Sequence, residues 1–273
     1  TGLEDWLAHQ GIALEQTLVL DPLSTPFPIP VQREVAGFLV DEIQTIAYPY
    51  FPDIRGDGMD QNTGITSGLG QITLNWASPL QIDREKNHER RVIELLKSSS
   101  GSWTDASEDI QPDFDAHGPL GFAEGKDKGS RTLAVAVEGR FQSLFAGKPS
   151  PLLEGPEQEA EGEDRPEEAI ADPDLDEEGE AQSPISGLVE TSPASARLIL
   201  IGSASFLTDT AISLATEATR TVYTQPLELI QNAVDWSLED RGLLTLRGRG
   251  QFSRLLKPLD RRQQMFWEYL NYA

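Results

Sequence analysis

Residues 196–202 read Ala196-Arg197-Leu198-Ile199-Leu200-Ile201-Gly202, an apolar run that ends at a glycine. A short apolar run bounded by a glycine is typical of a buried β-strand. Ser203-Ala204-Ser205 follows it, and we expect a helix from about Phe206 to Arg220. A strand, a short loop and a helix in this order indicate an α/β protein, so this stretch decides the fold class.

Further strands and helices are predicted on both sides of this stretch. The predicted strands are 17–21, 42–48, 71–77, 91–97, 133–139 and 243–247, and the predicted helices are 3–7 and 226–237. The first helix closes on Gly11 and leads into a buried strand, as in the second half of an α/β unit, so we expect the first strands of the sheet to precede Thr1. The proline-rich run 22–30 is expected to lack regular structure.

The charge of the chain is concentrated in one segment. The 273 residues carry 45 acidic and 22 basic side chains, a formal net charge of −23. Residues 154–180 alone hold 14 Asp or Glu and one Arg. A segment with so much charge and so few aromatic residues cannot bury enough surface to offset its ordering entropy. We therefore predict a disordered acidic insertion at 147–193 between two parts of one α/β domain, 1–146 and 194–257, with a basic and aromatic segment at 258–273.

Composition also excludes several classes of site. A surface this acidic disfavours nucleic-acid binding, since no basic stripe is visible. The chain has no cysteine, which removes disulfides, thiolate nucleophiles and iron–sulfur clusters. Its three histidines are scattered, so we expect no metal site and no cofactor.

The loop from Gly202 to Asp209 is the candidate ligand site, because α/β proteins bind ligands between the carboxyl end of a strand and the amino end of a helix. Its backbone N–H groups and the hydroxyls of Ser203 and Ser205 would hold an anion. The alternative is structural: either serine caps the helix, and Asp209 complements the helix dipole. The loop lacks the glycines and lysine of a nucleotide-binding motif and the second glycine of a nucleophile elbow.

The C-terminal segment combines basic and aromatic residues. Arg261 and Arg262 precede Trp267 and Tyr269. Such a combination is found at membrane–water interfaces, where the rings are amphipathic and the cations meet lipid headgroups. An ordinary helix that packs Phe266 and Leu270 on the core remains the alternative.

The sequence resembles GldG-like proteins, the auxiliary components of uncharacterised ABC transport systems. The resemblance rests on the apolar strand with Gly202-Ser203-Ala204-Ser205-Phe206 and on Asn232-Ala233-Val234-Asp235-Trp236. Further matches lie along the whole chain, at 3–7, 11–12, 18–21, 95–103 and 133–139. The aspartate that usually follows the glycine is Ser203 here.

The resemblance implies an extracytoplasmic α/β domain with a flavodoxin-like or glutamine-amidotransferase-like sheet flanked by helices. It further implies anchoring at the periplasmic face of the inner membrane by flanking spans, an ABC permease and an ATPase as partners, and no catalysis, because amidotransferase chemistry needs a cysteine. Our first hypothesis is therefore a non-enzymatic auxiliary domain that acts through protein contacts or ligand presentation. The second is an independent carbohydrate- or anion-binding module that uses the Gly202–Asp209 loop, and the third and weakest is a hydrolase that uses carboxylates.

Overall fold

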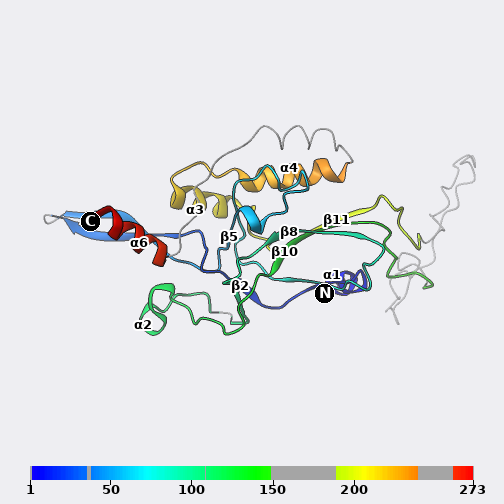
Figure 1. The fold of residues 1–273 in the computed structure, drawn as a ribbon, viewed down its shortest axis with the longest axis horizontal. Helices are drawn as coiled ribbons and strands as arrows, with labels where there is room; N and C mark the ends of the chain where they lie inside the picture. The colour runs from blue at the N-terminus through cyan, green and yellow to red at the C-terminus, as the bar shows by residue number, and fades with distance from the viewer. Residues whose placement is uncertain (1, 36–37, 108, 149–188, 239–260, 273) are drawn as a thin grey trace, which may run out of the picture.

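The computed structural model describes residues 2–35, 38–107, 109–148, 189–238 and 261–272 (Figure 1). The helices are α1 (Gly2–His9), α2 (Phe114–His117), α3 (Asp209–Thr219), α4 (Gln225–Ser237) and α6 (Arg261–Tyr272), with 3-10 turns η1 (Gly56–Gly58) and η2 (Gly118–Leu120). The strands are β1 (Ile12–Leu14), β2 (Leu18–Leu20), β3 (Phe27–Val35), β4 (Phe38–Ile46), β5 (Asp53–Ile54), β6 (Ile72–Thr73), β7 (Leu80–Ile82), β8 (Arg91–Lys97), β9 (Trp103–Asp105), β10 (Thr132–Glu138) and β11 (Arg197–Ile201).

Strand β10 is the centre of the largest sheet, which has the order β11-β10-β8. Its five residues from Leu133 to Val137 are fully buried. Successive side chains of a strand point to opposite faces. Accordingly Ala134 and Ala136 belong to the main core, whereas Val135 and Val137 belong to a smaller cluster with Ile12. A strand buried on both faces reads as a continuous apolar run, which is why this strand was predictable from sequence.

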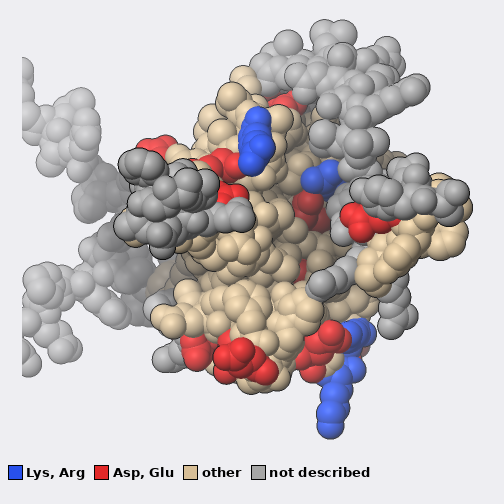
Figure 2. Space-filling view, turned by 90° about the vertical axis from the view of Figure 1, so that its left-hand side faces the viewer, with Lys and Arg blue, Asp and Glu red and all other residues tan. Residues whose placement is uncertain are grey.

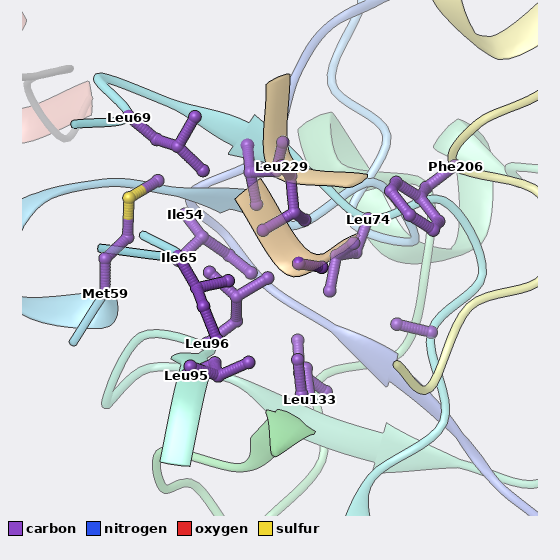
Figure 3. Packing of buried hydrophobic residues seen from close by; sticks show 14 of the residues in the cluster. Ile54, Met59, Ile65, Leu69, Leu74, Leu95, Leu96, Leu133, Phe206 and Leu229 are labelled. Carbon is purple, nitrogen blue, oxygen red and sulfur yellow. The ribbon is translucent and has the colours of Figure 1, made fainter. Parts of the chain in front are cut away.

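The main core lies between this sheet and helix α4 (Figure 3). Leu229 and Trp236 of α4 are buried in it together with Leu133 of β10 and Leu96 of β8. The aliphatic side chains Ile54, Ile65 and Leu74, from the segments between β5 and β7, fill the space between helix and sheet. The predicted helix 226–237 is thereby confirmed as α4.

The mixed helix and strand content expected from the sequence is confirmed, but the pairing differs from a flavodoxin-like sheet. All the ladders of the described residues are antiparallel, whereas flavodoxin-like sheets are parallel. Parallel neighbours need a long crossover, usually a helix. The connection from β8 to β10 contains β9, the short helix α2 and the turn η2, and β10 pairs antiparallel with β8.

The expectation that residues 22–30 lack regular structure is wrong for the second half of that run. Strand β3 begins at Phe27, includes Pro28 and Pro30, and pairs along its whole length with β4. A proline nitrogen has no hydrogen, so a ladder accepts proline only where that nitrogen faces away from the partner strand. Pro28 and Pro30 are two residues apart and satisfy this condition together. The resulting hairpin is the pair of blue strands that reaches away from the central sheet in Figure 1.

The acidic segment is inserted between two strands of one ladder. Beyond the end of the β10–β11 pairing, Gln142 forms a bridge with Thr191, and the Ser143 N–H donates to the Glu190 carbonyl at 2.7 Å. The two ends of the segment are therefore held beside each other by the folded domain. Residues 149–188 lie outside the described residues, as does the strand predicted at 243–247, so the predicted disorder stays a prediction.

Deleting residues 154–180 should leave the melting temperature within a few degrees of that of the intact chain. The ends of the segment already meet, and shortening a loop changes its closure entropy only slowly with length. Differential scanning calorimetry of the deleted and intact chains measures the difference. A larger loss would mean that the acidic segment packs on the domain.

Candidate functional site

The predicted ligand loop contacts the backbone of another segment. The Ser203 and Ser205 hydroxyls both donate to the Asn75 carbonyl, at 2.6 and 3.0 Å. Ser203 is buried, and Ser205 is partly buried. Because both hydroxyl protons are used by this carbonyl, neither is available to an anion in this conformation. Ligand binding at Gly202, Ser203, Ser205 and Asp209 stays a prediction.

The prediction that Ser203 or Ser205 caps the following helix is wrong. Helix α3 begins later, at Asp209, and the hydroxyl of Thr208 caps it by accepting from the Ala211 N–H. The serines lie more than one turn before the helix, where the chain crosses Asn75. Asp209 is exposed in the first turn of α3, where a carboxylate complements the helix dipole as expected.

Gly202 makes the closest backbone approach between its loop and the segment that contains Asn75 and Ser78. Its carbonyl accepts from the Ser78 N–H at 2.7 Å, and its own N–H donates to the Leu133 carbonyl at 2.8 Å. A Cβ placed on Gly202 would lie 2.1 Å from the Ser78 carbonyl oxygen. Backbone cannot move away as a flexible side chain could, so only glycine fits here.

Gly202→Ala should lower the free energy of unfolding by at least about 2 kcal/mol, because the methyl group overpacks against backbone on two sides. Chemical denaturation measures this loss. The matched control is Gly129→Ala, whose Cβ would meet nothing closer than the Arg131 Nη1 atom at 3.6 Å. Equal stabilities of the two variants would contradict the assignment of a close backbone contact at Gly202.

The loop supports an unusual backbone conformation at Trp76. Trp76 has φ of +48°, a left-handed value that costs a bulky residue of the order of 1–3 kcal/mol. The flanking carbonyl of Asn75 is held by the two serine hydroxyls, and the Trp76 N–H donates to the Tyr50 carbonyl at 3.0 Å. These bonds fix both ends of the peptide group between Asn75 and Trp76, and the Trp76 indole packs edge to face on Phe51 with ring centroids 4.9 Å apart.

Trp76 lines an apolar cavity of about 550 Å³ at the base of the β3–β4 hairpin. The walls come from β3, β4, α3 and the segment between β9 and α2. The lining residues are Phe27, Ile29, Ile46, Tyr48, Trp76, Ile110, Gln111, Pro112, Phe114, Thr210 and Leu214. None of these side chains carries a formal charge at neutral pH, and the size falls within the range of small-molecule pockets. The cavity thus suits an apolar group and offers no carboxylate, histidine or lysine for proton transfer.

Tyr48 connects the cavity to a buried aromatic cluster with Tyr50, Phe51, Trp103 and Phe122. Its hydroxyl donates to the Ile110 carbonyl at 3.0 Å, which ties one wall of the cavity to the other. Burial raises the pKa of Tyr48 above its usual value of 10.0, so the phenol is neutral at physiological pH. The tyrosine is therefore a wall and a hydrogen-bond donor, with no role as a base.

A buried carboxylate lies at the end of β2, outside the cavity. Asp21 is 1% exposed, and its oxygens accept from the Leu23 N–H, the Ser99 N–H and the Ser99 hydroxyl at 2.9, 2.7 and 2.6 Å. Desolvation raises the pKa of Asp21 more than these bonds lower it. The pKa of nearby Asp53 is also raised by burial, although Arg55 binds its carboxylate at 2.8 Å and opposes the rise. Both side chains tie loops together in the fold.

The raised pKa of Asp21 predicts a stability that falls with rising pH. The folded state holds the proton more tightly than the unfolded state, so this contribution is complete below the unfolded pKa and is lost as pH rises through the folded pKa. As pH rises above about 4, the unfolded pKa of an aspartate, Asp21→Asn should lose less unfolding free energy than the wild type. Denaturant titrations across this range measure both slopes, with exposed Asp57→Asn as the control. Equal slopes of unfolding free energy against pH for Asp21→Asn and the wild type would contradict the raised pKa of Asp21.

The membrane-proximal residues expected from sequence lie on or beside helix α6. Arg261 and Arg262 form its first turn, and Trp267 and Tyr269 are 54% and 75% exposed. Met265, Phe266 and Leu270 are exposed as well. The alternative in which Phe266 and Leu270 pack on the core is therefore wrong. The helix presents an apolar and aromatic surface instead.

In the part of the chain that the structure describes, no group of three His, Asp or Glu side chains comes together as a metal site would require. Nor does any of its helices combine the length and the apolar character that crossing a bilayer demands.

A family model described as ABC-type uncharacterized transport system, and labelled as an auxiliary component, matches residues 1–233. The chain belongs to this family. The match covers α1 through most of α4, including the sheet, the 202–209 loop and the cavity. No curated protein and no solved structure matches the chain significantly. The family assignment confirms the resemblance to an auxiliary component of ABC-type transport systems.

The cavity, including its wall residue Trp76, was not predicted from the sequence. The lining residues come from five separate stretches of sequence, at 27–29, 46–48, 76, 110–114 and 210–214, so no local pattern joins them. The one available signal was the alternation of Phe27, Ile29 and Val31 across two prolines, which marks the apolar face of a strand.

Proposed function

We propose that this chain is the extracytoplasmic domain of an auxiliary subunit of an ABC-type transport system, and that it works through protein contacts, without catalysis. The observation that carries the proposal is the family match over residues 1–233, since the family belongs to ABC-type transport. The partners would be the permease and the ATPase of the same system, which supply the pathway and the energy.

The candidate site supports a contact role. The cavity at the hairpin base is apolar, and the buried carboxylates of Asp21 and Asp53 lie outside its lining. Acid–base catalysis needs a titratable group with a pKa near the working pH that reaches the substrate. Of the lining residues only Tyr48 titrates, and its pKa is raised from 10.0. An apolar side chain or apolar ligand group is the occupant that such walls favour.

Helix α6 supports placement next to a membrane. Its first turn holds Arg261 and Arg262, and its exposed residues include Trp267 and Tyr269. Aromatic rings at the headgroup level and nearby cations stabilise a segment at the interface. In this proposal α6 lies between the domain and a membrane anchor in the full-length protein, on the periplasmic face of the inner membrane.

The partnership is tested by affinity purification of the full-length protein from gently solubilised native membranes, with mass spectrometry of the proteins that accompany it. We expect an ABC ATPase and a permease in near-fixed ratio to the tagged protein. An unrelated membrane protein carrying the same tag is the control. Recovery of the protein alone in the soluble fraction would contradict the proposal.

The location is tested by cysteine labelling, because the 273 residues contain no cysteine. Lys126→Cys, at an exposed position of the loop before β10, should react with a membrane-impermeant maleimide in cells whose outer membrane alone is permeabilised. Labelling only after disruption of the inner membrane would place the domain in the cytoplasm and contradict the proposal.

A further inference from the structure

The two edges of the β3–β4 hairpin differ in their capacity to bind another strand. β3 carries Pro28 and Pro30, whose nitrogens face outward because the ladder with β4 is unbroken. The outer edge of β3 therefore lacks two N–H donors. The missing donors close this edge to a further strand.

The outer edge of β4 is open. Pro28 pairs with Thr45 and Pro30 with Ile43, and in an antiparallel ladder both members of such a pair point their backbone groups away from each other. The N–H and C=O groups of Ile43 and Thr45 thus point outward from β4. Within the described ranges, no strand pairs with this edge and no hydrogen bond reaches these backbone groups.

Strand β4 lacks most of the features with which proteins usually protect an edge. Edge strands are commonly blunted by charged side chains, lysine above all, by proline, by a β-bulge or by short length, and of these β4 has only the acidic pair Asp41 and Glu42. Residues 38–46 contain no lysine, arginine or proline, and the pairing of all nine residues with β3 continues without a bulge. A two-stranded ribbon is also marginally stable by itself, so a third strand would stabilise it.

We propose that the outer edge of β4 is a docking edge, at which an extended, positively charged segment of a partner protein adds as a third strand. The inference rests on the proposed function in one respect, since that function makes protein contacts the work of this domain. Backbone hydrogen bonds to Ile43 and Thr45 supply the affinity, and alternate side chains of the added strand supply the specificity.

The acidic residues of β4 favour a positively charged partner strand. Strand β4 carries Asp41 and Glu42 and no cation, within a chain of net charge −23. Figure 2, which faces the end of the molecule from which the hairpin extends, shows a largely uncharged central surface with both acidic and basic side chains around its margin. A second copy of this chain would bring the same charges to the contact, and the repulsion disfavours it. A basic strand would instead bring positive charges to the acidic residues of β4.

The side chains beside the edge fit an alternating segment. Ile43 is 49% exposed on one face of the hairpin. Ile46 lies on the other face, next to Phe27, and lines the apolar cavity. A strand added along β4 would therefore cover Ile43 with one set of side chains and bring an apolar residue of the other set toward the cavity mouth.

The test uses the 273-residue chain and a synthetic nine-residue peptide that alternates Val or Ile with Lys or Thr. Amide hydrogen exchange at Ile43 and Thr45, followed by NMR, should slow about ten-fold when the peptide is present at ten times its dissociation constant, as expected from the bound fraction. The same peptide with every Lys replaced by Glu should bind at least about ten-fold more weakly. Absence of protection at both amides, or equal binding of the two peptides, would overturn the proposal.

A matched pair of variants isolates the backbone donors. Ile43→Pro with Thr45→Pro removes two outward N–H groups and leaves the ladder with β3 intact, as Pro28 and Pro30 do on the opposite strand. Ile43→Ala with Thr45→Ala removes the same side chains and keeps both N–H groups. The double-proline variant should bind the basic peptide at least about ten-fold more weakly than the double-alanine variant, given the usual contribution of a hydrogen bond. Equal affinities would overturn the proposal.

Three further outcomes show which part of the inference or of the proposed function fails. If amide exchange at Ile43 and Thr45 slows as the protein concentration rises, without any peptide, the occupant is a second copy of the chain and the choice of partner is overturned. If the full-length protein recovers its permease and ATPase equally well with the double-proline and double-alanine substitutions, the docking edge is wrong while the proposed function stands. If the unmodified protein recovers neither, the proposed function fails, and the peptide experiment still tests the edge.

Discussion

The close contact between Gly202 and the backbone of Ser78 is the constraint on which the rest of the arrangement depends. It joins the end of β11 to the segment after β6, two parts of the chain separated by more than a hundred residues. Once that contact forms, Ser203 and Ser205 reach the Asn75 carbonyl and Trp76 takes its left-handed conformation. The cavity wall is thus a consequence of packing at a glycine. The loop that resembles a ligand site in sequence acts as the support of a different site.

Much of the fold was predictable where the local pattern is strong. The strand predicted at 91–97 coincides with β8. The strands predicted at 133–139 and 196–202 differ from β10 and β11 by one residue at each end. These strands were predictable because a continuous apolar run bounded by polar residues or glycine has few alternative structures. Helix α4 was equally clear from its apolar periodicity. Pairing direction was not predictable, since it depends on what connects the strands and not on the strands themselves. Strand β3 was missed because proline was treated as a breaker, whereas its position relative to the partner strand decides its effect.

The candidate site was harder to predict for a similar reason. The serine hydroxyls could be recognised as hydrogen-bonding groups, but the identity of their partner, the Asn75 carbonyl, depends on tertiary structure. Trp76, Tyr48 and Ile46 each look like ordinary core residues in sequence, and only the fold shows that they surround one cavity. The family relation complements this geometry, because it places the cavity and the hairpin in an auxiliary component of an ABC-type transport system.

The prolines of β3 also limit how such hairpins could assemble. A chain of molecules that grew by adding the β4 edge of one to the β3 edge of the next would need N–H donors at Pro28 and Pro30, and both are missing. Open-ended fibres built from contacts between the β4 edge of one molecule and the β3 edge of the next are therefore disfavoured. Each hairpin offers a single edge with its full set of N–H donors, so only one strand can pair directly with it.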